Sequence, residues 1–121
     1  MKILVTGGAG FIGSNFIRLL LNRSKDCNII NLDKLTYAGN LENLRDIENN
    51  GRYKFVKGDI CDSNLVNKIV KNCDTIINFA AETHVDRSLL DARSFVRTDV
   101  EGTFILLEAA RKYNINKCYY L

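Results

Sequence analysis

A glycine-rich run near the start of the chain constrains the fold more than any other feature. Residues 7–13 read Gly-Gly-Ala-Gly-Phe-Ile-Gly and come directly after the apolar stretch 3–5. The next residues, 15–21, are typical of a helix. At these positions Gly10 would let a pyrophosphate approach the backbone, and Gly13 would let the helix pack closely on the strand. The run therefore predicts a strand, a phosphate-binding turn and a helix whose first N–H groups face the phosphates.

An acidic residue at the end of the second apolar stretch supports the same interpretation. Asp33 lies 20 residues after Gly13 and ends the stretch 28–32. At this spacing a carboxylate accepts hydrogen bonds from both hydroxyls of an adenosine ribose and repels a 2′-phosphate. The spacing favours NAD over NADP, and Lys34 next to it softens that preference. The alternatives are a glycine turn that serves packing alone and a solvated acid in a turn.

Apolar stretches alternate with helical patterns along the chain. These stretches are continuous rather than alternating, which indicates strands of a parallel sheet covered by helices on both faces. We expect strands at 2–6, 28–33, 53–57, 75–78 and 117–121. We expect helices at 11–23, 63–71 and 92–113, and a short one near 41–48. Right-handed crossovers then give a doubly wound, three-layer α/β fold of Rossmann type, with strand order 3-2-1-4-5 and a ligand cleft between strands 1 and 4.

Composition excludes several classes of partner. The 121 residues suit one domain, and their net charge of +3 comes from basic and acidic residues that are interspersed. Without a basic stripe we expect no nucleic-acid partner. No apolar run approaches membrane-spanning length and no signal peptide is recognisable, so we expect no membrane contact and a cytoplasmic location.

The cysteines give no metal-binding pattern. They are far apart, contain no Cys-x-x-Cys pair and are accompanied by a single histidine, His84. We therefore expect no metal site and reduced, mostly buried thiols.

The end of the chain differs from a complete fold of this type. Residues 117–121 look like the start of a fifth strand, and a two-halved dinucleotide fold continues to a sixth. We expect the N-terminal portion of a longer enzyme, truncated before the remaining strands and the substrate domain; the alternative is a tolerated edge strand. The helix at 92–113 has a second apolar face, which a second subunit or a missing part of the same protein would cover.

Several segments together carry a resemblance to a known enzyme family. Residues 6–14 resemble the start of the extended short-chain dehydrogenase/reductase superfamily. Residues 33–41 (Asp-Lys-Leu-Thr-Tyr-Ala-Gly-Asn-Leu) and 79–88 (Phe-Ala-Ala-Glu-Thr-His-Val-Asp-Arg-Ser) resemble the dTDP-glucose 4,6-dehydratases within it, and 102–111 add a further match. The resemblance covers essentially the whole chain.

The resemblance implies a binding site for NAD spread over five segments. The implied cofactor-binding residues are Gly7, Gly10, Phe11, Ile12, Gly13, Asp33, Lys34, Leu35, Thr36, Asp59, Ile60, Ala80, Ala81, Glu82, Thr83 and Thr98. It places His84 near the sugar of the substrate. Chemistry alone leaves other interpretations open: Asp59 as a turn acid, residues 80–81 as packing residues and His84 as a loop histidine.

The implied activity of the parent enzyme is the NAD-dependent dehydration of dTDP-glucose to a 4-keto-6-deoxy sugar, by a homodimer. The Tyr-x-x-x-Lys pair and the Asp-Glu pair that this chemistry needs are not recognisable in the 121 residues, so we expect the chain alone to be inactive. One departure is Asp99, where the family has asparagine, which puts the local helix-to-sheet geometry in question. A nucleotide-sugar 4-epimerase and a non-catalytic NAD-binding module are the alternatives, and the nucleotide of the sugar donor stays open.

Overall fold

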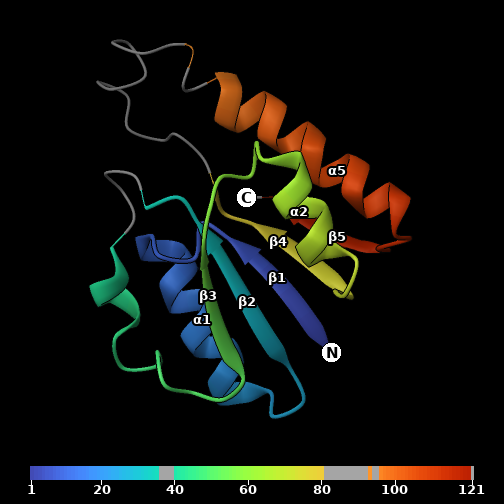
Figure 1. Cartoon of the computed structure of the whole chain (residues 1–121). Helices are drawn as coiled ribbons and strands as arrows, with labels where there is room; N and C mark the ends of the chain where they lie inside the picture. The colour runs from blue at the N-terminus through green and yellow to red at the C-terminus, as the bar shows by residue number, and fades with distance from the viewer. Residues whose placement is uncertain (36–39, 81–92, 94–95, 121) are drawn as a thin grey trace.

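Five parallel strands form one sheet, in the order β3-β2-β1-β4-β5, in the computed structural model of the chain (Figure 1). The structure describes residues 1–35, 40–80, 93 and 96–120. The strands are β1 (Lys2–Thr6), β2 (Asn28–Asp33), β3 (Tyr53–Lys57), β4 (Thr75–Asn78) and β5 (Lys117–Tyr120). This confirms the predicted Rossmann-type fold and its strand order. The central strand is β1, so the glycine run that follows it emerges in the middle of the sheet edge.

The helices agree with the prediction in two cases and differ from it in two. Helix α1 (Phe11–Arg23) has the predicted bounds, and α2 (Ser63–Val70) ends one residue before the predicted end. The predicted helix near 41–48 is only a 3-10 turn, η1 (Leu41–Leu44), followed by turns. The predicted helix 92–113 is π-helical in η2 (Arg97–Gly102) and α-helical in α5 (Thr103–Lys112). Of its first residues, 92, 94 and 95 lie outside the described residues.

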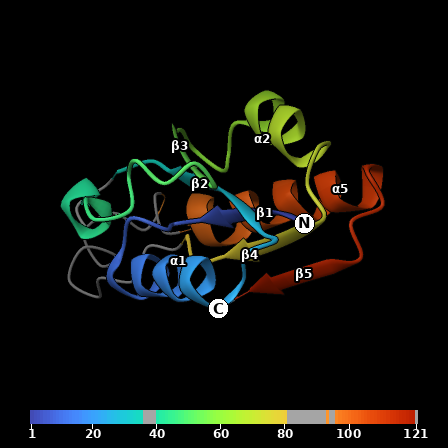
Figure 2. The ribbon, with the colours of Figure 1, turned by 90° about the horizontal axis from the view of Figure 1, so that it is seen from below.

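The helices cover both faces of the sheet. Figure 2 shows α1 on one side of the sheet and α2 and α5 on the other. Alternate residues of β1 therefore face different cores: Leu4 packs in a cluster with Val66 and Leu106, whereas Val5 packs in a cluster with Ile17. All of these side chains are fully buried. Each contributes about 1.5–3 kcal/mol by leaving water, and together they hold the strand ends in fixed positions.

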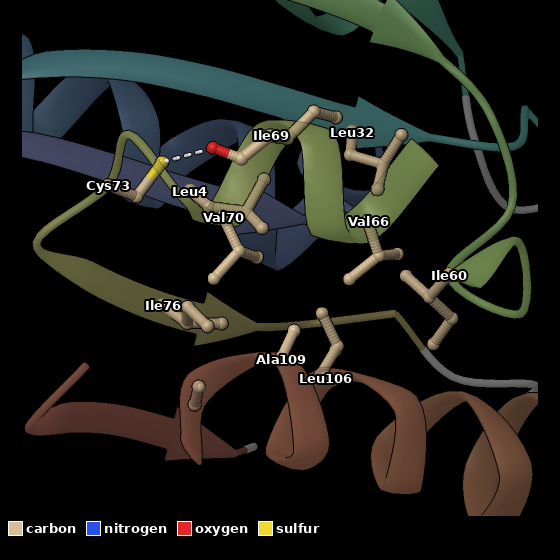
Figure 3. Packing of buried hydrophobic residues seen from close by; sticks show 11 residues of the cluster. Leu4, Leu32, Ile60, Val66, Ile69, Val70, Cys73, Ile76, Leu106 and Ala109 are labelled. Carbon is tan, nitrogen blue, oxygen red and sulfur yellow. Dashed lines mark hydrogen bonds between the residues drawn. The ribbon is translucent and has the colours of Figure 1, made fainter. Parts of the chain in front are cut away.

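Cys73 closes one end of the core between the sheet and α2 (Figure 3). Its side chain is 6% exposed, and its thiol donates to the Ile69 carbonyl at 3.4 Å. Burial raises the pKa of the Cys73 thiol from 9.0 to about 11. All four cysteines are free thiols.

We predict that Cys73 makes the folded state lose stability at high pH. Below pH 9 the Cys73 thiol is protonated in both the folded and the unfolded protein, so its contribution to stability is complete. Between pH 9 and about 11 the thiol ionises in the unfolded protein but not yet in the folded one, which favours unfolding. The expected loss is about 2–3 kcal/mol. Urea unfolding of the wild type and of Cys73→Ala across this range measures it, and the free-energy difference between the two proteins should shrink as pH rises. Parallel curves would contradict the prediction.

The described residues contain no helix that is both long and apolar enough to cross a membrane.

Candidate functional site

The glycine turn lies between the carboxyl ends of β2 and β4. The Gly7 N–H donates to the Leu32 carbonyl at 2.9 Å. Gly7 has a φ of +71°, and a Cβ at this position would lie 2.6 Å from the Ala80 nitrogen. Glycine is required for both reasons: it adopts positive φ freely and lets two backbones approach closely. The turn therefore contacts Ala80, a residue predicted to line the same site.

The first turn of α1 packs directly on the glycine turn. A Cβ at Gly13 would lie 2.5 Å from the Gly7 carbonyl oxygen, so a larger residue would push the helix away. Gly10 precedes the helix in an extended conformation, and no side chain caps the helix start. The side chains of Phe11 and Ile12 are 80% and 68% exposed. Because the first N–H groups of a helix have no intrahelical partner and form the positive end of its dipole, this end suits an anion.

The Asp33 carboxylate joins the glycine turn to the segment after β2. It is 8% exposed. One oxygen accepts from the Ala9 N–H and the other from the Leu35 N–H, both at 2.8 Å. Leu35 has a positive φ of 59°, a backbone conformation that is uncommon for residues other than glycine. The carboxylate is thus held in one orientation, and each oxygen retains a second acceptor position.

Asn31 is a part of the site that the sequence analysis missed. It lies fully buried in β2, where its Oδ1 accepts from the Gly8 N–H at 3.0 Å and its Nδ2 donates to the Tyr53 hydroxyl at 3.1 Å. Together with Asp33, it gives successive N–H groups of the glycine turn a side-chain acceptor on β2. The available signal was a polar residue inside an otherwise apolar strand.

We predict that Asn31→Ala lowers the free energy of unfolding by about 2–3 kcal/mol, because it leaves a buried N–H unpaired and opens a cavity. Asn43→Ala is the matched control: its Nδ2 donates to the Ala9 carbonyl at 2.9 Å, which the Asn40 N–H also reaches at 3.0 Å. Its expected cost is about 1 kcal/mol. Urea unfolding of both variants measures the difference, and equal costs would contradict the role given to Asn31.

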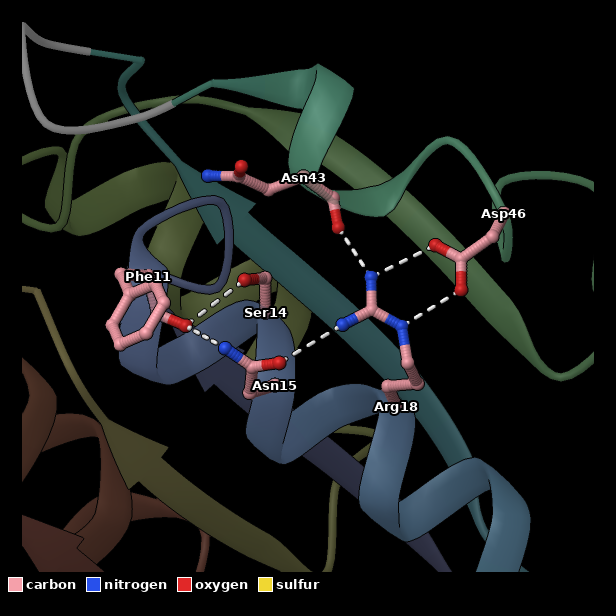
Figure 4. A network of polar contacts seen from close by, with 6 residues as sticks. All are labelled: Phe11, Ser14, Asn15, Arg18, Asn43 and Asp46. Atoms are coloured by element: carbon pink, nitrogen blue, oxygen red, sulfur yellow. Dashed lines mark hydrogen bonds and ion pairs between the residues drawn. The ribbon is translucent and has the colours of Figure 1, made fainter.

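A polar network fastens η1 to α1 beside the glycine turn (Figure 4). The Arg18 guanidinium forms an ion pair with Asp46 at 2.7 Å and donates to the Asn43 carbonyl at 2.6 Å. It also donates to Asn15 at 3.1 Å. The exposed ion pair contributes little by itself, but it holds Asn43 where its side chain reaches Ala9. The Ala9 carbonyl is thus hydrogen-bonded by Asn43 of η1, whereas the Ala9 N–H is hydrogen-bonded by Asp33.

Asp59 lies at the end of β3, next to the end of β2. Its carboxylate accepts from the Cys61 N–H at 2.9 Å and forms an ion pair with Lys34 at 3.3 Å. Burial raises the pKa of Asp59, but the Cys61 N–H and the Lys34 ammonium lower it more, so its pKa lies below the usual value. The group is therefore ionised at neutral pH.

The loop after β3 also contacts η2. Ile60 is 4% exposed, and its Cδ1 would lie 2.3 Å from a Cβ at Gly102. The Cys61 thiol donates to the Arg97 carbonyl at 3.1 Å. Thr98, predicted to reach the cofactor, lies in the same π-helical segment, between the two residues that this loop contacts. Asp99 lies in this segment too, and the effect expected of it on the helix-to-sheet geometry stays a prediction.

The described residues bring together the glycine turn, Asp33, Lys34, Leu35, Asp59, Ile60 and Ala80 at one edge of the sheet. Five predicted site residues lie outside the described residues: Thr36, Ala81, Glu82, Thr83 and His84. Their roles stay predictions. The binding roles of the glycine and acidic positions stay predictions as well, and the buried amide of Asn31 that supports them was not predicted.

Comparison with known proteins identifies the family. The family described as GDP-mannose 4,6 dehydratase matches residues 4–121. The chain belongs to this family. It is 57% identical over 115 residues to a dTDP-glucose 4,6-dehydratase of Escherichia coli. The matched region covers 93% of this chain and 32% of that relative. The predicted resemblance to the N-terminal, NAD-binding part of these enzymes is thereby confirmed, and the chain spans about a third of the length of the relatives it matches.

Solved structures give the same result. A dTDP-glucose 4,6-dehydratase of Streptomyces venezuelae with NAD bound matches with a TM-score of 0.92 at 46% identity, over 98% of this chain and 38% of that one. A UDP-glucose 4-epimerase of Thermotoga maritima matches with a TM-score of 0.87 at 31% identity, over 99% of this chain and 37% of that one. Enzymes with different reactions thus share this part of the fold.

Proposed function

We propose that residues 1–121 form the N-terminal portion of an NAD-binding domain, with Asp33 binding the adenosine ribose and the N-terminus of α1 binding the pyrophosphate. The observation that carries the proposal is the Asp33 carboxylate, fixed by the N–H groups of Ala9 and Leu35 at the end of β2. Both oxygens can accept a second hydrogen bond, as a ribose diol requires. The close approach of Gly7 and Gly13 supports the same assignment, since it sets the helix end beside that carboxylate.

We further propose that the whole protein dehydrates dTDP-glucose to the 4-keto-6-deoxy sugar. Bound NAD+ would supply the hydride acceptor for such a reaction. The residues of this chain bind and orient: Lys34, Leu35 and Thr36 near the ribose, Asp59 and Ile60 near the adenine, Ala80 to Thr83 along the cofactor and His84 at the sugar. The acid and base groups would come from beyond residue 121, so the segment 1–121 by itself is predicted to be inactive. Support comes from the similarity to dTDP-glucose 4,6-dehydratases.

A nucleotide-sugar 4-epimerase is the second candidate, supported by the likeness to the Thermotoga maritima enzyme. The run Thr-Tyr-Ala-Gly-Asn at 36–40 favours the dehydratase, because it resembles the dTDP-glucose 4,6-dehydratases and is not expected in an epimerase. A non-catalytic NAD-binding module is the third.

One pair of experiments on the full-length protein separates these functions. Calorimetric titration with NAD+ and NADP+ tests the cofactor site, and the expected result is binding of NAD+ with clearly weaker binding of NADP+. Incubation with dTDP-glucose, and with the GDP, CDP and UDP sugars, followed by NMR analysis of the products, tests the reaction. A 4-keto-6-deoxy sugar supports the dehydratase, an epimerised sugar supports the epimerase, and NAD+ binding without turnover supports the module. Absence of NAD+ binding would contradict the proposal.

We also propose a cytoplasmic homodimer. Three large apolar side chains on η2 and α5, Val100, Phe104 and Leu107, are 65%, 61% and 47% exposed, which supports a covering partner. Sedimentation equilibrium of the full-length protein tests this, and a monomer at all concentrations would contradict it.

A further inference from the structure

An ion pair lies beside Asp33, at the ends of two neighbouring strands. The Lys34 ammonium is 3.3 Å from the Asp59 carboxylate. The register of β2 and β3 aligns Asp33 with Lys57, and the Gly58 N–H donates to the Asp33 carbonyl at 3.1 Å. The ion pair therefore joins the two strand ends next to the carboxylate proposed to bind the ribose.

Asp59 is the more firmly held member of the pair. Its Oδ1 accepts from the Cys61 N–H at 2.9 Å, which leaves Oδ2 directed at Lys34. The Asp59 side chain is 27% exposed, against 53% for Lys34. Its lowered pKa keeps the carboxylate charged at neutral pH. A fixed anion thus holds a more exposed cation.

This arrangement matters for the choice of cofactor. NADP+ differs from NAD+ by a phosphate on the ribose 2′ oxygen, and sites that accept it supply a cation there. Asp33 repels that phosphate. Lys34 follows Asp33 directly in the chain, so its ammonium is a charge that could offset the repulsion, were it not paired.

We propose that Asp59 determines the choice between NAD+ and NADP+ by holding Lys34 in this ion pair, where its charge is not available to a 2′-phosphate. The inference rests on the proposed function, because it assumes that the ribose binds at Asp33. Asp59 is then a specificity-determining residue as well as a neighbour of the adenine, and Asp33 and Asp59 act against NADP+ by different means: direct repulsion and withdrawal of a cation.

The substitution Asp59→Asn tests the proposal. The amide oxygen can still accept from the Cys61 N–H, but the amide NH2 group facing Lys34 is a donor and cannot form the ion pair. We expect the ratio of the dissociation constants, Kd for NADP+ over Kd for NAD+, to fall about three- to fivefold in calorimetric titrations of the full-length protein. The gain should shrink at high salt, because the released ammonium is exposed.

Substitution of two different lysines in the Asp59→Asn variant shows whether the effect comes from the released Lys34 ammonium or from a general change in electrostatic potential. Adding Lys34→Met to Asp59→Asn should abolish the gain in relative affinity for NADP+. Adding Lys57→Met instead should leave that gain in place, although it removes a lysine at the end of the neighbouring strand β3. Asp62→Asn removes a charge three residues along, and asparagine replaces aspartate well as the N-cap of α2, so the ratio should not move. An equal gain in Asp62→Asn, or loss of the gain with Lys57→Met, would overturn the proposal.

The failure of this inference is distinct from failure of the proposed function. If the wild type binds no NAD+, the proposed function fails and the inference fails with it. If the wild type binds NAD+ and Asp59→Asn leaves the ratio unchanged, only the inference fails. Should Asp59→Asn not fold, Lys34→Met in the wild-type chain replaces it. If the paired ammonium is not available to the 2′-phosphate, this variant should change the affinity for NADP+ by less than about twofold, and a larger loss would overturn the proposal.

Discussion

Asp33→Asn is expected to weaken the binding of NAD+ about a hundredfold, because two charge-assisted hydrogen bonds to the ribose become two ordinary ones, one accepted by the amide oxygen and one donated by the NH2 group. The free protein is affected as well. Both carboxylate oxygens accept a backbone N–H, from Ala9 and from Leu35, whereas an amide offers a single acceptor. One of these N–H groups would therefore face an NH2 group, and we expect the free energy of unfolding to fall by about 1–3 kcal/mol.

The measurement for Asp33→Asn is calorimetric titration of the full-length protein with NAD+, combined with urea unfolding. Asp26→Asn is the matched control, since it makes the same chemical change just before β2, at the opposite edge of the sheet, where the side chain is exposed. The control should bind NAD+ as the wild type does. Retention of wild-type affinity in Asp33→Asn would remove the central support for the proposed cofactor site.

The inner strands β1, β2 and β4 could be predicted from the sequence because they are buried along most of their length, whereas the outer strands β3 and β5 are partly exposed. A parallel sheet covered on both faces needs continuous apolar runs, and turn residues separate these runs along the chain. All five strands begin at the predicted residues; β5 is described to Tyr120, one residue before the predicted end. The glycine turn could be predicted for a related reason: Gly7 and Gly13 are required by backbone contacts within a few residues of the turn or at the adjacent strand end.

The parts that could not be predicted depend on contacts between distant residues. The segment near 41–48 is a 3-10 turn whose position is set by the Arg18 network and by hydrogen bonds to Ala9, and none of these partners is visible as a local pattern. The π-helical geometry of η2 coincides with contacts from Ile60 and Cys61, which lie far earlier in the chain. Asn31 was counted among apolar strand residues, because its partners, Gly8 and Tyr53, become neighbours only when the sheet forms.

Gly7→Ala is expected to cause the largest loss of stability, because Gly7 meets both a local requirement, its positive φ, and a close contact with the distant strand end after β4. Two independent costs apply. Alanine is strained at a φ of +71°, and its Cβ would lie 2.6 Å from the Ala80 nitrogen and 2.7 Å from the Phe79 carbonyl carbon, both backbone atoms that cannot rotate away. We expect the free energy of unfolding to fall by about 3–5 kcal/mol.

Gly51→Ala provides the control for Gly7→Ala, because it makes the same substitution at a turn where a Cβ would meet no atom within 4 Å and where φ is not positive. We expect a change within about 0.5 kcal/mol, or a small stabilisation, since alanine restricts the unfolded chain. Urea unfolding of both variants gives the comparison. If Gly7→Ala lowered the free energy of unfolding by no more than about 1 kcal/mol beyond the change for Gly51→Ala, the strand end after β4 would have to move away from the glycine turn. The close contact between them would then not be what fixes Asp33, Ala9 and the start of α1 in their relative positions.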